Sequence, residues 1–230
     1  MPPARGDHDA RRADVSEAVW RVLAERGLGG LTLRAVAAEM GASTGLLTHY
    51  FPTKRALVQH ALEVAEARTA SRARRRPEAG GLPALRAALL DVLPLTEESA
   101  AMNRVWVSSW DNALADPGFH RNERARLARW RATLRTHVTD AQRQGELPAA
   151  ADPDEVVAAA AAFTHGLVAH ALFDPDAYPP HRQTALLDAF LLGARTGTGP
   201  QARTGTGPDA RTDPGPDART DPGPDARTGR

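Results

Sequence analysis

The chain has 230 residues, 42% of them hydrophobic, and its 29 Lys and Arg residues nearly balance its 28 Asp and Glu residues, for a net charge of +1. This length can bury one helical domain of ordinary size and a smaller one, but the near-neutral charge excludes a uniformly basic protein, so any nucleic-acid-binding surface must be local. The absence of cysteine excludes disulfides, thiolate nucleophiles and Cys-based zinc sites.

The composition predicts an all-α protein. Ala, Leu, Arg and Glu are abundant and β-branched runs are rare, which favours helix over most of residues 10–193. Apolar residues at three- and four-residue spacing divide this range into about nine helices. Residues 1–9 have no such spacing and are expected to be disordered. The N-terminal stretch also has no apolar core, so it is not a signal peptide.

The first predicted helix covers residues 11–26, and Gly27 follows as its C-terminal stop. Thr32 can cap a second helix over residues 33–40, because a hydroxyl at this position accepts from a free backbone N–H of the first turn. Gly41 can then adopt the left-handed conformation that ends it. The sequence therefore predicts two short helices joined by a tight turn.

A third, short helix is expected to begin at Ser43 or Thr44, and a fourth begins after Thr53 and runs to about Arg76. Together these segments predict a compact N-terminal bundle over residues 10–76. The arrangement of its second and third helices is typical of a helix-turn-helix, in which the second helix of the pair enters the major groove of DNA.

Short polar side chains and a glycine near the start of the third helix fit this function, since they allow close approach to phosphates and base edges. Thr48 offers a hydroxyl and a methyl group to the bases, and Leu46 can contact a thymine methyl. His49 and Tyr50 can contact the DNA backbone or pack inside the protein. The expected DNA-binding residues are Thr32, Arg34, Ser43, Thr44, Gly45, Leu46, Thr48, His49, Tyr50 and Lys54.

Lys54 is the chain's single lysine and stands where the fourth helix should begin. A cation in the first turn of a helix opposes the helix dipole, at a cost of some tenths of a kcal/mol. An anion is therefore expected beside it. The ammonium and the free amides after Thr53 together predict a DNA phosphate contact.

A linker with two prolines and two glycines follows at residues 77–83 and separates the bundle from a second helical domain, residues 77–194. The basic run at residues 72–76 before it can be a nucleic-acid contact or a solvated helix end. The helices expected in the second domain cover residues 85–93, 97–115, 119–144, about 153–173 and 181–194.

The fourth of these contains residues 156–173, which carry no formal charge and approach the length of a membrane span. Most of them are Ala, however, and His165, His170 and Gly166 disfavour insertion. We expect a buried packing helix and no membrane association. Small residues on this helix, with apolar residues on the last one, suit a four-helix interface between two protomers, although packing within one chain would explain one face of each.

A candidate ligand pocket begins with Met102, Trp106 and Trp110, which repeat every four residues along one helix face. Aromatic stripes of this kind often belong to a core instead. Indole rings attract quaternary ammonium groups, and Asp111 and Glu98 can add counter-charge, so a choline-like cation is one candidate effector. The expected pocket residues are Met102, Trp106, Trp110, Phe119, Trp130 and Phe163.

Residues 194–230 repeat an eight-residue unit, ARTGTGPQ, ARTGTGPD and twice ARTDPGPD, and residues 195–230 form the C-terminal tail. The units contain no large apolar side chain and are rich in Pro and Gly, so this tail is expected to be disordered. No His pattern for a metal, no nucleotide-binding loop and no nucleophile motif is present. Neither an enzyme nor a cofactor is expected; an all-α enzyme and a helical interaction protein that does not bind DNA remain as alternatives.

Residues 11–68 resemble the DNA-binding domain of the TetR family of bacterial regulators, and the segment STGLLTHYFPTK is most similar to its BetI-like branch. The family often has Tyr where this chain has Thr48, so a Tyr contact to phosphate is not implied at that position. The residues that carry the resemblance are Gly27, Thr32, Ala37, Gly41, Ser43, Gly45, His49, Tyr50, Phe51 and Lys54.

The resemblance implies a cytoplasmic homodimer that binds a pseudo-palindromic operator in double-stranded DNA and acts as a repressor. It also implies that a small molecule bound in the C-terminal domain releases the DNA. Within the family, regulation of efflux or of other metabolism is expected in preference to regulation of choline and betaine metabolism, although a quaternary ammonium effector stays open.

Overall fold

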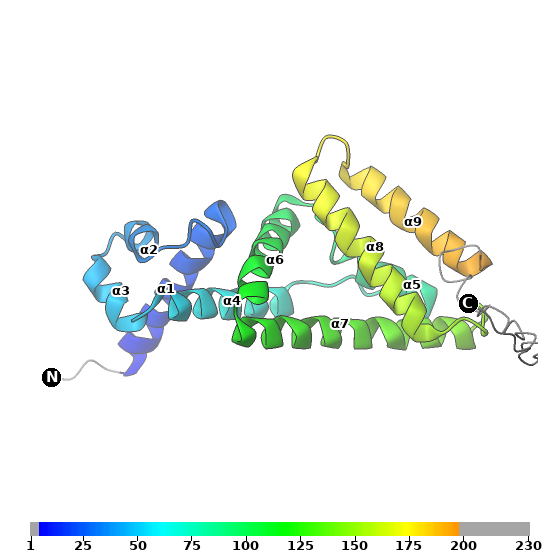
Figure 1. The fold of residues 1–230 in the computed structure, drawn as a ribbon, viewed down its shortest axis with the longest axis horizontal. Coiled ribbons are helices and arrows are strands. Elements are labelled where there is room, and N and C mark those ends of the chain that lie inside the picture. The colour runs from blue at the N-terminus through cyan, green and yellow to red at the C-terminus, as the bar shows by residue number, and fades with distance from the viewer. Residues whose placement is uncertain (1–4, 198–230) are drawn as a thin grey trace, which may run out of the picture.

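The computed structural model describes residues 5–197, and within this range the chain forms nine α-helices and no strand (Figure 1), which confirms the predicted all-α class. Helices α1, α2 and α3 lie at one end of the molecule, and α4 extends from them toward the middle, where α6 stands (Figure 1). The helices are α1 (Arg5–Arg26), α2 (Leu33–Met40), α3 (Thr44–Tyr50), α4 (Lys54–Ser71), α5 (Leu82–Leu90), α6 (Glu97–Ala115), α7 (Pro117–Arg143), α8 (Pro153–Phe173) and α9 (Pro180–Thr196).

Local capping bonds fix the helix-turn-helix. The Thr32 hydroxyl accepts the N–H of Ala35 at 3.1 Å at the start of α2, and Gly41 ends that helix with a φ of 62°. A side chain would strain the backbone at this left-handed position. The Thr53 hydroxyl accepts the N–H of Ala56 at 3.1 Å and starts α4. These residues set the turn between α2 and α3 and the position of Lys54.

Several predicted boundaries differ from the structure. Helix α5 covers Leu82–Leu90 and not residues 85–93, so it begins inside the expected linker at residues 77–83. Helix α1 begins at Arg5, within the nine residues that were expected to be disordered. Helix α4 ends at Ser71, before the expected end at about Arg76. The cause of the early end is a long-range contact: the backbone N–H of Arg75 donates to the Asp91 carboxylate at 3.1 Å, and its guanidinium contacts the same group at 2.6 Å. Asp91 therefore holds this segment extended.

The hydrophobic interior forms two clusters that do not coincide with the predicted domains. The first cluster joins the buried faces of α1 to α4 and also takes in four residues of the second half, namely Met102, Val105, Ala113 and Phe119. The second cluster lies among α5, α7, α8 and α9, with Leu89, Leu134, Val138 and Leu187 fully buried. Helix α6 and the start of α7 thus complete the core of the N-terminal bundle.

Helix α8 is long and apolar enough to cross a bilayer, with a mean hydropathy of 1.7 over its most apolar window and 44% of that window buried. Its buried side chains, including Val157, Ala160 and Leu167, belong to the second core cluster or pack beside it. Packing within the chain therefore accounts for one face of this helix, and the rest of its apolar surface is not buried. The predicted disordered tail falls outside the described residues from 198 onward, as do residues 1–4 of the predicted N-terminal segment.

Candidate DNA-binding surface and ligand cavity

Helix α3 turns a polar face outward because two apolar residues anchor its other face. Leu47 is fully buried and Phe51 is 6% exposed, both in the first core cluster. Leu46 and Tyr50 are half-buried at the edge of the helix. The residues left exposed on this segment are Ser43, Thr44, Gly45, Thr48 and His49.

The hydroxyl groups near α3 have distinct surroundings. The Thr48 hydroxyl donates to the Thr44 carbonyl oxygen at 3.0 Å, which fixes its rotamer. Ser43 is the N-cap of α3, yet its side chain makes no capping bond there. An exposed Ser43 hydroxyl and the free amides of the first turn are groups that can bind a phosphate oxygen. Arg34 is also exposed, on the neighbouring helix α2.

Lys54 is the first residue of α4 and is exposed. No ion pair of Lys54 occurs among residues 11–197, whereas the adjacent Arg55 pairs with Asp116. The Lys54 ammonium therefore remains available to an external anion. It follows α3 by three residues, Phe51, Pro52 and Thr53, which places it beside the exposed face of that helix.

The aromatic residues at the end of α3 pack against one another. The rings of His49 and Tyr50 meet edge to face with centroids 6.1 Å apart, and Tyr50 lies 6.5 Å from Phe51. Tyr50 packs against the first core cluster, whereas His49 is exposed. Tyr50 thus has the packing role that the sequence allowed, whereas a DNA contact of the exposed His49 stays a prediction.

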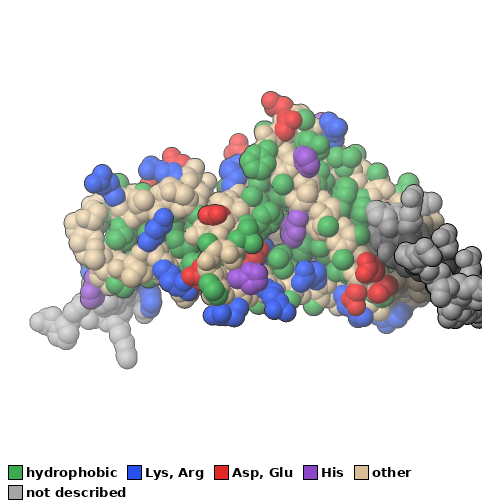
Figure 2. Space-filling view, viewed as in Figure 1, with side chains coloured by type: hydrophobic (Ala, Val, Ile, Leu, Met, Phe, Trp, Pro, Cys, Tyr) green, Lys and Arg blue, Asp and Glu red, His purple; other side chains and the backbone are tan. Residues whose placement is uncertain are grey.

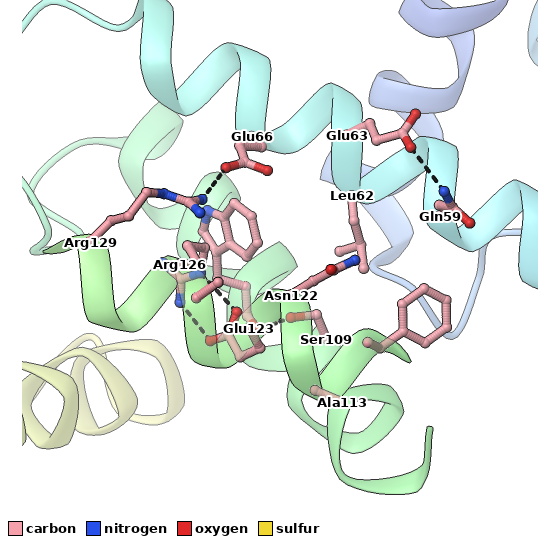
Figure 3. Close-up of a pocket in the computed structure, with 13 residues that line it drawn as sticks. Gln59, Leu62, Glu63, Glu66, Ser109, Ala113, Asn122, Glu123, Arg126 and Arg129 are labelled. Carbon is pink, nitrogen blue, oxygen red and sulfur yellow. Dashed lines mark hydrogen bonds and ion pairs between the residues drawn. The ribbon is translucent and has the colours of Figure 1, made fainter. Parts of the chain in front are cut away.

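Two cavities lie where α4 faces the second half of the structure. The first, which we call the α4 cavity, has a volume of about 380 Å³ and lies between α4, α6 and α7 (Figure 3). The second, the linker cavity, has a volume of about 410 Å³ and extends from α4 along the segment after it to α5, α7 and α8. Both volumes suit a small organic ligand. The residues that line both cavities are Glu66, Trp106, Arg126 and Arg129.

Trp106 lines both cavities, and both its indole N–H and its ring face make contacts within the protein. Its indole N–H donates to the Thr69 hydroxyl at 3.3 Å. The Arg126 guanidinium lies over its ring, 4.3 Å from the centroid, and donates to both carboxylate oxygens of Glu123 at 2.8 and 2.7 Å. Figure 3 shows Arg126 beside Glu123, and Arg129 of α7 extending to Glu66 of α4. A side chain of the protein thus already occupies the cation site on Trp106.

The six expected pocket residues do not converge on one space. Trp106 and Phe119 line the α4 cavity, and Trp106 and Trp130 line the linker cavity. Met102 is buried in the first core cluster. Phe163 stacks on Phe190 of α9 with ring centroids 4.6 Å apart, on the side of α8 that faces α9.

Trp110 lines neither cavity, but it contacts His165, which lines the linker cavity. The indole N–H of Trp110 donates to Glu123 at 3.2 Å, and its ring centroid lies 6.0 Å from that of His165. His165 also contacts Trp130, with ring centroids 4.8 Å apart, and lines the linker cavity. Burial, with the positive charge of Arg126, holds the pKa of His165 below its ordinary value of 6.5.

Sequence reasoning missed His165, Arg126 and Arg72 as pocket residues. The sequence signal for Arg126 was its position three residues after Glu123, which places the two side chains together on one helix face. His165 and Arg72 carry no local signal, because their role comes from distant segments. Within the described part of the chain, no group of three His, Asp or Glu side chains is placed to hold a metal ion.

An apolar surface runs over α8 and α9, where hydrophobic side chains gather on the face shown in Figure 2. Phe173 at the end of α8 is 84% exposed and Leu192 of α9 is 58% exposed. Apolar side chains at this exposure, next to the small residues of α8, are typical of a surface that another chain covers.

The N-terminal and C-terminal parts of the chain each match a known protein family. The model for bacterial regulatory proteins of the TetR family matches residues 15–61, and the model for the C-terminal region of BetI-type transcriptional repressors matches residues 83–195. The regulator BetI of Burkholderia mallei is 32% identical over 135 residues, 57% of this chain and 69% of BetI. The regulator PksA of Bacillus subtilis is 35% identical over 106 residues, 45% of this chain and about half, 52%, of PksA.

Solved structures give the same fold. A transcriptional regulator from Rhodococcus sp. Rha1 superposes with a TM-score of 0.64 at 26% identity, covering 80% of this chain and 96% of that one. A regulator from Saccharomonospora viridis, crystallised in complex with choline, has a TM-score of 0.69 at 22% identity, with the same two coverages. The two family matches, the helix-turn-helix and the all-helical second half together show that this chain belongs to the TetR family of bacterial transcriptional regulators.

Proposed function

We propose that the protein is a repressor that binds a pseudo-palindromic operator in double-stranded DNA as a homodimer. The observation that carries this proposal is the exposed Lys54 ammonium, which lies next to the polar face of α3 and forms no ion pair with residues 11–197. In a helix-turn-helix that face lies in the major groove, and a neighbouring cation binds the phosphate backbone. The two-fold symmetry of a dimer requires two half-sites related in the same way.

The apolar surface of α8 and α9 is the proposed dimer interface. Phe173 and Leu192 expose large apolar side chains there, and Arg86 of α5 contacts Asp188 of α9 at 2.5 Å, which orients the last helix on its own chain. Two copies of this surface would form a four-helix interface. The protein would act in the cytoplasm, where its operator lies.

We further propose that a small molecule in the cavities beside α4 releases the DNA. Helix α4 begins at Lys54 and its later turns supply Glu66 and Thr69 to the cavity walls. One rigid element therefore extends from the DNA surface to the cavities. A ligand that displaced Trp106 or Arg129 would act directly on this helix, since Thr69 and Glu66 bind those two side chains.

A quaternary ammonium is one candidate effector, because the Saccharomonospora viridis regulator was crystallised with choline. The Arg126 guanidinium over Trp106 weakens this case, since choline would have to displace a cation that is also bound to Glu123. An effector connected with efflux or other metabolism is the alternative that we favour.

A gel-shift titration of the full chain with the intergenic DNA beside its own gene tests the DNA-binding function. The dimer should bind a pseudo-palindrome there, and its affinity should fall steeply with salt as counterions are released. Lys54→Ala should weaken binding to all sequences and reduce the salt slope by about one. No affinity for the promoter at low salt, with effectors absent, would contradict the proposal.

A further inference from the structure

The linker cavity has an excess of positive charge. Two acids line it, Glu66 and Asp91, and each is bound by an arginine: Arg129 contacts Glu66 at 2.5 Å and Arg75 contacts Asp91 at 2.6 Å. Arg126 is bound to Glu123. The other charged side chains of the wall are Arg72 and Arg74. Two guanidinium groups are therefore left without a counter-charge.

Arg72 is the better placed of these two groups. It is the first residue after α4 and is half-buried, whereas Arg74 is exposed. Neither forms an ion pair with any residue from 11 to 197. A guanidinium can donate two parallel N–H bonds to a carboxylate, and partial burial makes such a contact stronger than it is in bulk water. The unpaired state of Arg72 thus indicates an anionic partner from outside the chain.

The remaining wall of the cavity is mostly apolar, and its polar side chains are Thr69, His137 and His165. Trp130 and Trp106 present indole rings, and Ala88 and Val92 of α5 add aliphatic surface. His165 packs against Trp130 and, with its pKa lowered by burial, is mainly neutral near pH 7. Such a wall suits an aromatic body by apolar burial and ring stacking. The Trp106 face that would attract a cation is already covered by Arg126 at 4.3 Å.

We propose that the linker cavity binds an organic anion, a carboxylate carried on a flat aromatic body. Arg72 holds the carboxylate, Arg74 adds positive charge at the opening, and Trp130 packs against the rings. This proposal rests on the proposed function in that it names the class of effector, but the binding itself does not require DNA.

The test is isothermal titration of the full-length protein, without DNA, with three probes that share a naphthalene body and differ in charge. These are 2-naphthoate, its uncharged amide 2-naphthamide, and the cation (2-naphthylmethyl)trimethylammonium. The carboxylate should bind about tenfold more tightly than the amide, because a charge-assisted contact is worth at least this factor. The quaternary ammonium should bind more weakly than the amide. Equal affinity for carboxylate and amide, preference for the cation, or no heat from any probe would overturn the proposal.

The variant Arg72→Met assigns the carboxylate contact. It should lower the affinity for 2-naphthoate about tenfold and leave that for 2-naphthamide unchanged, because it removes the charge and keeps the aliphatic stem. Arg76→Met, in the same segment but outside the cavity wall, is the matched control and should change neither. Circular dichroism melting of both variants checks that they fold. Equal losses for both probes, or an unchanged naphthoate affinity in folded Arg72→Met, would refute the assignment.

The titration with naphthalene probes and the gel-shift titration can fail independently of each other. A protein that binds its promoter but shows no preference for 2-naphthoate would retain the regulatory role and lose the anion site. A protein that binds 2-naphthoate through Arg72 but has no affinity for DNA would show the converse.

Discussion

The guanidinium carbon of Arg55 lies 5.0 Å from the centroid of the Phe119 ring. The same guanidinium pairs with Asp116, the N-cap of α7, whose carboxylate accepts the N–H groups of Gly118 at 2.7 Å and Phe119 at 3.1 Å. Since Arg55 directly follows Lys54, this contact joins the start of α4 at the DNA surface to the start of α7 beside the α4 cavity.

Replacing Arg55 by Ala should destabilise the protein modestly. The ion pair is partly exposed and the cation–π contact is single, so we expect a loss of about 1 kcal/mol in the free energy of unfolding. Urea denaturation followed by circular dichroism measures this value. Arg121→Ala, at an exposed position of α7, is the control and should have a smaller effect; a larger loss for Arg121 would contradict the role given to Arg55.

Replacing Thr48 by Ala should alter base preference without affecting general affinity. The hydroxyl of Thr48 is bound to the Thr44 carbonyl, so the methyl group of its fixed rotamer is available to the bases. Loss of one apolar contact should reduce the ratio of specific to random binding by about fivefold, or roughly 1 kcal/mol. Fluorescence anisotropy with operator and scrambled duplexes measures both affinities. Equal losses on the two duplexes would mean that Thr48 contacts only the backbone.

Acidification should destabilise the fold through His165. Its folded pKa lies below the ordinary 6.5, so below that pH the unfolded chain binds protons more strongly and the free energy of unfolding falls. His165→Phe keeps an aromatic ring between Trp110 and Trp130 and should reduce the drop in stability between about pH 7.5 and 5.5. Urea denaturation at several pH values measures the drop. His120→Gln, at an exposed site, should leave it unchanged; an unaltered drop in His165→Phe would exclude this contribution.

Introducing a charge on the apolar surface of α9 should dissociate the proposed dimer. Leu192→Glu would place a carboxylate in an apolar interface, at a cost of several kcal/mol. Light scattering coupled to size exclusion should then give the mass of one chain, 24.6 kDa. Leu114→Glu is the matched control, since Leu114 is 83% exposed on α6. Dissociation by Leu114→Glu, or a dimer that persists in Leu192→Glu, would place the interface elsewhere.

The sequence predicted those parts of the fold that local interactions determine. The bounds of α6 agree with the prediction, because Thr96 caps the helix and Asp116 with Pro117 ends it, all within a few residues. The end of α4 could not be predicted, because it depends on the contact between Arg75 and Asp91, which are sixteen residues apart. Capping residues thus determine both ends of α6, whereas a tertiary contact determines the end of α4.

The same distinction applies to the candidate sites. The exposure of Thr48 follows from the helix periodicity of α3, and the position of Lys54 follows from Pro52, which separates α3 from α4. The sequence therefore placed both residues correctly on the surface of the N-terminal half. The surroundings of Trp106 required the packing of α6 on α7, which alone brings Arg126 over its ring. Phe163 lies on the face of α8 toward α9. The sequence did not predict this, because an Ala-rich helix with weak amphipathicity does not specify which of its faces meets which neighbour.

Because Met102, Val105, Ala113 and Phe119 lie in the same apolar cluster as the four N-terminal helices, a truncated chain ending at the linker would leave that cluster open on one side. A hybrid regulator that joins the N-terminal helices to the ligand-binding domain of another protein at residues 77–83 would leave the same cluster incomplete. A hybrid that keeps residues 97–119 together with the N-terminal helices would retain the side chains that complete this cluster. A junction after these residues is therefore better for building such hybrids.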